Sequence, residues 1–221
     1  MLSDHWPLLG LRVRTPRLEL RPPTENDLAM VADVAARGIH EPGRNPFLSS
    51  WADRPPAERA QEILRRHWRH LGAWSPSDWA LGLAVFESGR PVGMQHMHGK
   101  EFAVLGEVLT GSWLGREFQG RGIGTEMRSA VLHLAFAGLG AAYALSETFA
   151  DNPAALAISR KLGYRTDGIT RYAVDGHARP SQRFRMSRAQ WEATDRPQIT
   201  IAGLDPCLAM FGAERPRPVG G

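Results

Sequence analysis

The stretch that decides the fold reads Trp113-Leu114-Gly115-Arg116-Glu117-Phe118-Gln119-Gly120-Arg121-Gly122-Ile123-Gly124-Thr125. Its beginning predicts a strand and its end predicts a helix, so a glycine-rich turn joins the two. Gly120, Gly122 and Gly124 remove side chains where the backbone must approach another group closely. Free backbone N–H groups and the helix dipole make such a helix start an anion site, and Arg121 adds a cation. The segment therefore predicts a phosphate or pyrophosphate site.

A glycine turn alone is not specific, because a plain tight turn has the same composition. The segment lacks the Gly-Lys-Ser/Thr of a P-loop and the full dinucleotide fingerprint after a first βα turn. A second segment narrows the choice. Asn152-Pro153-Ala154-Ala155-Leu156-Ala157-Ile158-Ser159-Arg160-Lys161-Leu162-Gly163-Tyr164 predicts a helix that Gly163 ends.

Together the two segments resemble the paired motifs of the GNAT N-acyltransferases. These are Q/R-x-x-G-x-G/A after a strand and N-x-x-A/S…K-x-G-F/Y in a later helix, at the separation found here. Thr15-Pro16-Arg17-Leu18-Glu19-Leu20-Arg21 is similar to the T-x-R-L-x-L-R opening of the branch that acetylates ribosomal-protein N-termini. The resemblance spans residues 14–193 and implies an acyl-CoA-dependent N-acyltransferase that works by direct transfer.

The element order favours an α/β (α+β) fold around one mixed sheet. The resemblance implies the GNAT fold, with about seven strands splayed in the middle and about four to five flanking helices. We expect one acyltransferase domain over residues 1–195 and a Pro/Gly-rich, poorly ordered tail over residues 196–221. The expected strands are 17–21, 79–87, 92–98, 108–114, 142–149, 164–169 and 183–186, and the expected helices are 24–36, 57–71, 122–136, 152–162 and 187–193.

In the GNAT family, acyl-CoA lies between the motif strand and the next strand. The resemblance therefore implies that the backbone of Trp113 and Leu114 pairs with pantetheine like an added strand. Asn152 would bond the pantetheine, and a helix cap is a compatible role for it. The co-substrate would be acetyl-CoA, with succinyl-CoA as the alternative. The residues implied to bind the cofactor at the glycine turn are Gln119, Gly120, Arg121, Gly122, Ile123, Gly124 and Thr125.

Ser159 stands where the family's usual general acid is a tyrosine, and the ribosomal-protein branch has serine there. Its hydroxyl would protonate the departing thiolate directly or through water. A small residue facing a neighbouring helix is the alternative. The general base is open between Glu107 and Glu147, and each of these could instead be a solvated strand residue.

The loop over residues 38–56 is expected to shape the acceptor site, with Arg44 and Trp51 as substrate-binding candidates. Arg44 or Arg54 could also pair with the carboxylate of a succinyl donor. Trp68, in the helix over 57–71, is expected in the core. The expected acceptor is a peptide or protein N-terminal α-amine. A small amine such as an antibiotic or polyamine is the alternative, and so is a non-catalytic acyl-CoA sensor, because the usual tyrosine is absent.

The cysteine and histidine residues argue against a disulfide, a covalent acyl-cysteine and a metal site. The single cysteine, Cys207, excludes an intrachain disulfide and a thiolate zinc site, and its place in the tail argues against a covalent acyl-cysteine. His96 and His98 would share one face of a regular strand and are further candidates for the base. Because no third ligand accompanies them, we expect no metal.

The composition is that of an ordinary globular protein, with 43% apolar and 23% charged residues. The net charge is +4, but the arginines are dispersed along the chain, so nucleic-acid binding is only weakly indicated. No apolar run reaches the roughly 18 residues of a membrane helix. No secretion signal is visible at the start. We therefore expect a cytoplasmic protein, and the family resemblance suggests a homodimer.

Overall fold

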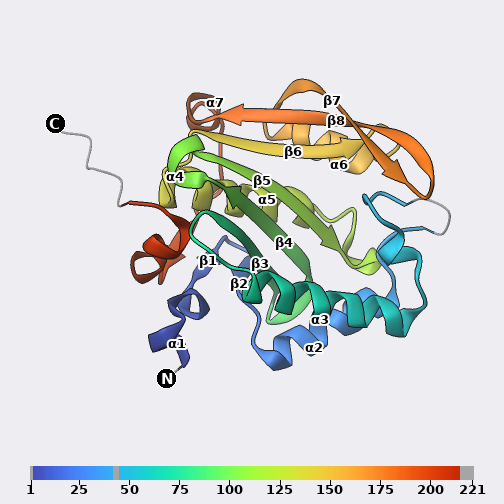
Figure 1. Cartoon of the computed structure of the whole chain (residues 1–221), viewed down its shortest axis with the longest axis horizontal. Coiled ribbons are helices and arrows are strands. Elements are labelled where there is room, and N and C mark those ends of the chain that lie inside the picture. Colours follow the sequence, from blue (N-terminus) through green and yellow to red (C-terminus); the bar gives the residue numbers. More distant parts are fainter. Residues whose placement is uncertain (1, 42–44, 215–221) are drawn as a thin grey trace.

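The computed structural model describes residues 2–41 and 45–214 of the 221. One nine-stranded sheet runs through them in the order β7-β8-β6-β5-β4-β3-β2-β1-β9 (Figure 1). All neighbouring pairs are antiparallel except β5 and β6, which are parallel. The strands are β1 (Arg12–Arg14), β2 (Leu18–Arg21), β3 (Asp78–Glu87), β4 (Arg90–Lys100), β5 (Glu107–Leu114), β6 (Tyr143–Phe149), β7 (Arg165–Val174), β8 (His177–Ser187) and β9 (Thr200–Ala202). The expected α/β architecture around one mixed sheet is confirmed.

The sequence predicts seven strands, and the two that it misses are the short edge strands β1 and β9. Each has three residues, too few for an alternating pattern to stand out. β1 pairs with β2 on one side and with β9 on the other. The pairing of the first strand with one near the end of the chain is a long-range contact that no local pattern signals.

Helices cover both faces of the sheet (Figure 1). α2 (Glu25–Arg37) and α3 (Pro56–Gly72) lie on one face. α5 (Ile123–His133), which continues into a π-helical turn (Leu134–Gly138), and α6 (Pro153–Lys161) lie on the other. Shorter helices are α1 (Leu2–His5), α4 (Phe102–Leu105) and α7 (Arg188–Glu192). Among the helices described, none is long and apolar enough to span a membrane.

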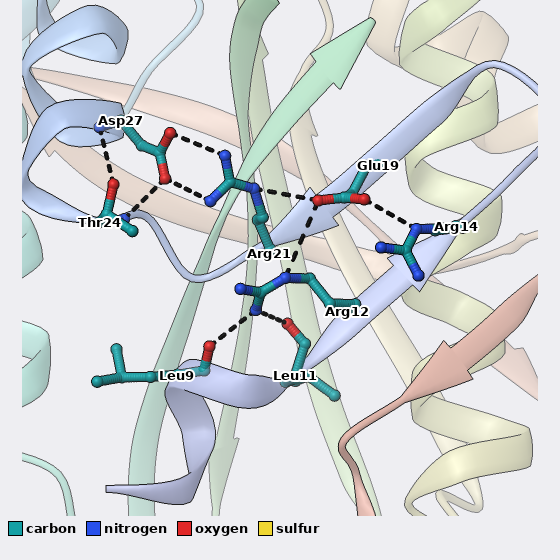
Figure 2. Close-up of polar contacts among 8 residues, drawn as sticks. All are labelled: Leu9, Leu11, Arg12, Arg14, Glu19, Arg21, Thr24 and Asp27. Atoms are coloured by element: carbon teal, nitrogen blue, oxygen red, sulfur yellow. Dashed lines mark hydrogen bonds and ion pairs between the residues drawn. The ribbon is translucent and has the colours of Figure 1, made fainter. Parts of the chain in front are cut away.

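An ion-pair cluster fixes the start of α2 against β2 (Figure 2). Arg21 donates to both carboxylate oxygens of Asp27, at 2.6 and 2.8 Å, and also pairs with Glu19 at 3.1 Å. Asp27 and Thr24 form a capping box, as the sequence predicts. Burial raises the pKa of Asp27, but the bonds from Thr24 and Arg21 outweigh it, so the pKa lies below its usual value. The cluster thereby sets the position of α2 on the sheet.

Two hydrophobic clusters lie on opposite faces of the sheet. Met127 of α5 belongs to the cluster that includes Leu114, whereas Val31 of α2 belongs to the one that includes Trp113. Trp113 and Leu114 are neighbours in β5, and successive side chains of a strand point to opposite faces. The end of β5 is therefore anchored on both sides.

The expectation of a poorly ordered tail is wrong for much of residues 196–221. β9 completes the sheet, and the 3-10 helix Asp205–Phe211 buries Cys207, Leu208 and Phe211. The indole N–H of Trp79 donates to the Phe211 carbonyl at 3.0 Å. The Pro and Gly content suggested disorder, but the apolar residues between them supply core contacts. Residues 215–221 lie outside the described part of the chain.

Trp68 is also placed differently from the prediction, because its side chain is 59% exposed. Ile63 is the buried residue of α3, and Leu64 and Leu71 are half-buried. The helix therefore contacts the rest of the protein through a narrow stripe, and Trp68 lies outside it.

Candidate active site

β5 and β6 separate part-way along their length. β5 pairs with β4 as far as Leu114, but among the described strands it pairs with β6 only over residues 107–110, opposite 143–146. Thr110 and Ser146 are the last partners, so the strands diverge after them. A side chain at Gly111 would meet open space. The splay leaves one backbone edge of residues 111–114 without β6 as a partner, and an extended ligand can pair with such an edge.

The glycine turn lies directly beyond this splayed end. Gly120 and Gly122 have φ of 74° and 78°, in the left-handed region that favours glycine. Gly122 is the N-cap of α5 and provides no side-chain hydrogen bond, so the first N–H groups of the helix are left for a ligand. An added Cβ at Gly124 would lie 3.0 Å from Ile158 Cδ1. The predicted anion site therefore has the backbone shape that it requires.

Two carboxylates beside the turn are each paired with an arginine. Glu126, the acidic residue in the first turn of α5, accepts from Thr15 at 2.6 Å and pairs with Arg17 at 2.6 Å, so its charge is compensated. Arg121 pairs with Glu87 at 2.7 Å and its side chain is 50% exposed. Arg17 also donates to the Arg121 carbonyl. Arg17 is a member of this site that sequence reasoning missed, because β2 reaches α5 only in the folded chain.

Gln119 does not point outward like the rest of the turn. Its amide nitrogen donates to the Ile39 carbonyl at 2.5 Å and to the Leu114 carbonyl at 3.1 Å. The side chain thus ties the turn to the segment after α2. A contact between Gln119 and pyrophosphate stays a prediction, and its backbone is the part left to make it.

α6 supplies the two predicted residues of the second motif. Asn152 Oδ1 accepts from the Ala155 N–H at 3.2 Å, so its role as a helix cap is confirmed. Its amide N–H₂ group is a separate donor that this bond does not use. Ser159 is buried on the same helix. Ile158 lies against Gly124 of α5, so the two motifs meet in space.

Glu147 lies at the splay, on the face opposite α5. Its neighbour Ser146 is the last β6 partner of β5 and contacts α5, so Glu147 points toward the α2 side. Tyr172 donates to Glu147 at 2.5 Å and Thr170 donates at 3.4 Å. Burial and the bond to Glu147 raise the pKa of Tyr172 to about 12, so the phenol remains a donor. These two residues of β7, which sequence reasoning missed, hold the carboxylate in place.

Glu107 is not brought into this arrangement. It is the first residue of β5 and forms an ion pair with Arg185. Leu114 is seven positions further along the strand, which corresponds to roughly 23 Å. The structure therefore places Glu147 at the splay and Glu107 at the opposite end of β5.

The acceptor-side candidates lie in and beside the loop after α2. Trp51 is 3% exposed and packs on Trp113, with ring centroids 6.1 Å apart, so it supports the site from within the core and presents no open wall to a substrate. Arg54 pairs with Glu62 at 3.9 Å. Arg44 lies outside the described residues.

The same loop contacts the hairpin of β7 and β8 (Figure 1). Ser50 donates to Asp175 at 2.5 Å, and Arg179 donates to the Asn45 carbonyl at 3.1 Å. Segments more than a hundred residues apart in the sequence therefore meet on the α2 side of the splay.

His96 and His98 share one face of β4, where His70 of α3 packs against both with ring centroids 6.0 and 5.5 Å away. Burial lowers the pKa of each of the three. Within the described residues, no group of three His, Cys, Asp or Glu side chains is placed to hold a metal ion. Cys207 is buried, and burial raises the pKa of its thiol to about 11.

Arg128 is a charged residue at the splay that sequence reasoning also missed. It is buried on the inner face of α5 and reaches both β5 and β6. Met127, Val131 and Leu132 are also buried on this helix. An arginine within an apolar stripe was the signal that could have identified it.

Comparisons with known proteins agree with this geometry. Residues 17–165 match the family model described as an acetyltransferase (GNAT) domain. The structure is similar to Mycobacterium smegmatis RimJ in complex with CoA-disulfide, with a TM-score of 0.64, 16% identity, and coverage of 94% of this chain and 98% of that one. It is also similar to a GCN5-related N-acetyltransferase from Brucella melitensis, with a TM-score of 0.65, 20% identity and coverage of 82% and 80%.

A third similar structure is RimL, the ribosomal L7/L12 alpha-N-protein acetyltransferase, in complex with coenzyme A. Its TM-score is 0.58 and its identity is 17%, over 78% of this chain and 95% of that one. Identities this low support the shared fold and carry no substrate from one protein to another.

Proposed function

The chain belongs to the GNAT acetyltransferase family, and on this premise we propose that it transfers an acetyl group from acetyl-CoA to a peptide or protein N-terminal α-amine. Family membership makes it an acyl-CoA-dependent N-acyltransferase. The observation that carries the proposal is the splay of β5 and β6 with the glycine turn at its open end. A cofactor with a pyrophosphate and an extended amide-bearing arm fits both parts.

We assign the cofactor contacts as follows. Gly122, Gly124 and Thr125 would offer backbone N–H groups to the pyrophosphate, with Arg17 and Arg121 beside it. Trp113 and Leu114 would pair with the pantetheine through their backbone, and the amide of Asn152 would donate to it. Acetyl-CoA supplies the activated acyl group in this family.

Direct transfer needs a base, an oxyanion donor and an acid. Glu147 would accept the proton of the attacking amine on the α2 side of the sheet, where Tyr172 and Thr170 hold it. A backbone N–H in residues 111–114 would stabilise the oxyanion. Ser159 would deliver a proton to the leaving sulfur from the α6 side.

Three observations favour a peptide or protein N-terminus as the acceptor. Two of the similar structures are RimJ and RimL, and RimL is a ribosomal L7/L12 alpha-N-protein acetyltransferase. Residues 15–21 resemble the opening motif of that branch. Contacts from the loop after α2 to the β7–β8 hairpin place two chain segments beside the α2 side, and we take this to favour a narrow acceptor such as a chain terminus.

A turnover panel tests the proposed function. The protein is mixed with acetyl-CoA or succinyl-CoA and either short peptides or small amines, and CoA release is followed with a thiol reagent. We expect acetyl transfer to peptides with a free α-amine and none to the same peptides blocked at the N-terminus. Turnover confined to small amines would contradict the acceptor, and CoA binding without turnover would favour a sensor.

Replacing Ser159 by Ala should lower kcat by roughly 10- to 100-fold with little change in the KM for acetyl-CoA. The hydroxyl is removed from a buried helical position that accepts a small side chain, so the fold should be retained. Stopped-time assays with the best peptide of the panel measure the effect. An unchanged kcat would assign Ser159 a packing role only.

Replacing Glu147 by Gln should lower kcat/KM by about 100-fold, because the amide cannot accept the amine proton. Glu107→Gln is the matched control. It neutralises a carboxylate of similar exposure at the far end of β5, so turnover should stay near the wild-type value. If Glu107→Gln is the impaired variant and Glu147→Gln is active, the assignment of the base is reversed.

A further inference from the structure

Arg128 is a buried cation without an anionic partner in the described residues. The residue is 7% exposed. Its Nη1 donates to the Ser146 hydroxyl at 3.0 Å and its Nη2 donates to the Ser112 hydroxyl at 3.1 Å, while its Nε–H has no partner in the described part of the chain. Arginine cannot shed its proton in a protein. A buried charge that only hydroxyls solvate is costly, so the site is incomplete without an anion.

The guanidinium lies at the vertex of the splay, on the α5 face. Ser146 is in the last β5–β6 pair, and Ser112 is the next residue of β5 on the same face after Thr110. The Tyr164 hydroxyl lies 3.3 Å from Thr110 Oγ1 and interacts with the guanidinium as well. Arg128 therefore bridges the two strands at the point where they separate.

We propose that Arg128 stabilises the coenzyme A thiolate that leaves when the amide bond forms. This inference rests on the proposed function, which puts the cofactor between β5 and β6. The pyrophosphate site is at the start of α5, and Arg128 is four residues beyond Gly124 on the same helix, about 6 Å along its axis. A pantetheine arm that runs from the start of α5 into the splay brings its sulfur toward the vertex. The Nε–H of Arg128, which has no partner among the described residues, lies there.

The charges balance through the transfer. The amine nitrogen forms a bond to the acyl carbon, the carbon–sulfur bond breaks, and its electron pair stays on sulfur. The amine proton goes to Glu147. Ser159 is an aliphatic alcohol, a much weaker acid than the tyrosine found at this position in most of the family. A fixed cation supports the thiolate until a proton reaches it.

A purely structural bridge would not require the charge. A neutral amide offers N–H donors to two serine hydroxyls and leaves no buried cation uncompensated. The buried guanidinium is explained by a ligand that becomes negative beside it. Among the described residues, the Tyr164 phenol interacts with Arg128, and burial raises its pKa, so it stays neutral.

Ionisation of bound coenzyme A tests the proposal without an acceptor. The ultraviolet absorbance of the thiolate is titrated against pH for CoA bound to wild type, Arg128→Gln, Arg128→Lys and the double variant Ser112→Ala/Ser146→Ala. The complex with desulfo-CoA serves as the blank and removes the signal of Tyr164. We expect the midpoint with wild type about 1 to 3 pH units below that of free CoA.

Arg128→Gln should return the midpoint to that of free CoA or above, with CoA affinity within a few-fold of wild type and kcat about 100-fold lower. Arg128→Lys should retain part of the shift, and the double serine variant should retain most of it. An unshifted midpoint in the wild-type complex overturns the proposal whatever the variants do, so it stays testable if Arg128→Gln fails to fold.

Two further outcomes would also overturn it. Loss of the shift in the double serine variant would make Arg128 a strand bridge. A rate loss confined to succinyl-CoA would make it a partner for a donor carboxylate. If wild type binds no coenzyme A at all, the proposed function fails first, and this result is distinct from CoA binding with an unshifted thiol.

Discussion

Gly122→Val should weaken the binding of coenzyme A by roughly 100- to 10,000-fold and leave a folded protein. Gly122 has φ of 78°, a conformation that a β-branched residue adopts only with strain. Relief of that strain turns the first N–H groups of α5 away from the anion. Two charge-assisted hydrogen bonds lost at about 1.5–3 kcal/mol each account for the expected range.

Titration calorimetry with CoA measures this effect, and Gly140→Val is the matched control. Gly140 has φ of 81°, lies in the turn before β6, and an added Cβ there would meet nothing within 4 Å. It carries the same backbone strain without facing the cofactor, so its melting temperature should fall while its affinity for CoA stays unchanged. A folded Gly122→Val that binds CoA like wild type would remove the glycine turn from the site.

Local chemistry explains what could be predicted from the sequence. The glycine pattern, the Thr24 cap and the Asn152 cap depend on residues within one turn of each other, so the sequence shows them directly. The splay was expected only through the family resemblance, because no sequence pattern in β5 or β6 indicates where the pairing of these two strands ends. The same limit left the choice between Glu107 and Glu147 open.

The residues that were missed are those whose roles arise between distant segments. Arg17 joins the anion site from the segment before β2, and Tyr172 holds Glu147 from β7. Arg128 is different, since its position in an apolar helical face was visible in the sequence. Its importance was not, because both hydroxyls that it bonds belong to strands that only the fold brings together.

The two faces of the sheet divide the proposed chemistry. Glu147 points toward the α2 side, and Arg128 contacts Ser146 on the α5 side, although Ser146 and Glu147 are consecutive. The base and the thiolate partner are thus held apart by the sheet itself. The acyl group must therefore lie in the splay, between Glu147 and Arg128.

A chain that ends at Gln198 should fail to fold, although the sequence predicted a poorly ordered tail over residues 196–221. The truncation removes β9 and the 3-10 helix Asp205–Phe211. Burial of the two large side chains, Leu208 and Phe211, contributes roughly 1.5–3 kcal/mol each, and Cys207 is buried as well. The loss also leaves the indole N–H groups of Trp79 and Trp74 without their carbonyl partners. The sum, more than about 5 kcal/mol, is comparable to the whole stability of a typical domain.

Thermal melts and solubility after expression measure this effect, with a chain ending at Glu214 as the control. That control keeps every described contact of the tail and removes only residues 215–221, so it should melt like the full chain. Phe211→Ala is the graded version. It opens a cavity beside Trp79 and should cost about 3–5 kcal/mol, or roughly 10 °C in Tm. If a chain ending at Gln198 melts at the temperature of the full chain, the sheet is stable without β9. The tail would then contribute nothing to the stability of the core.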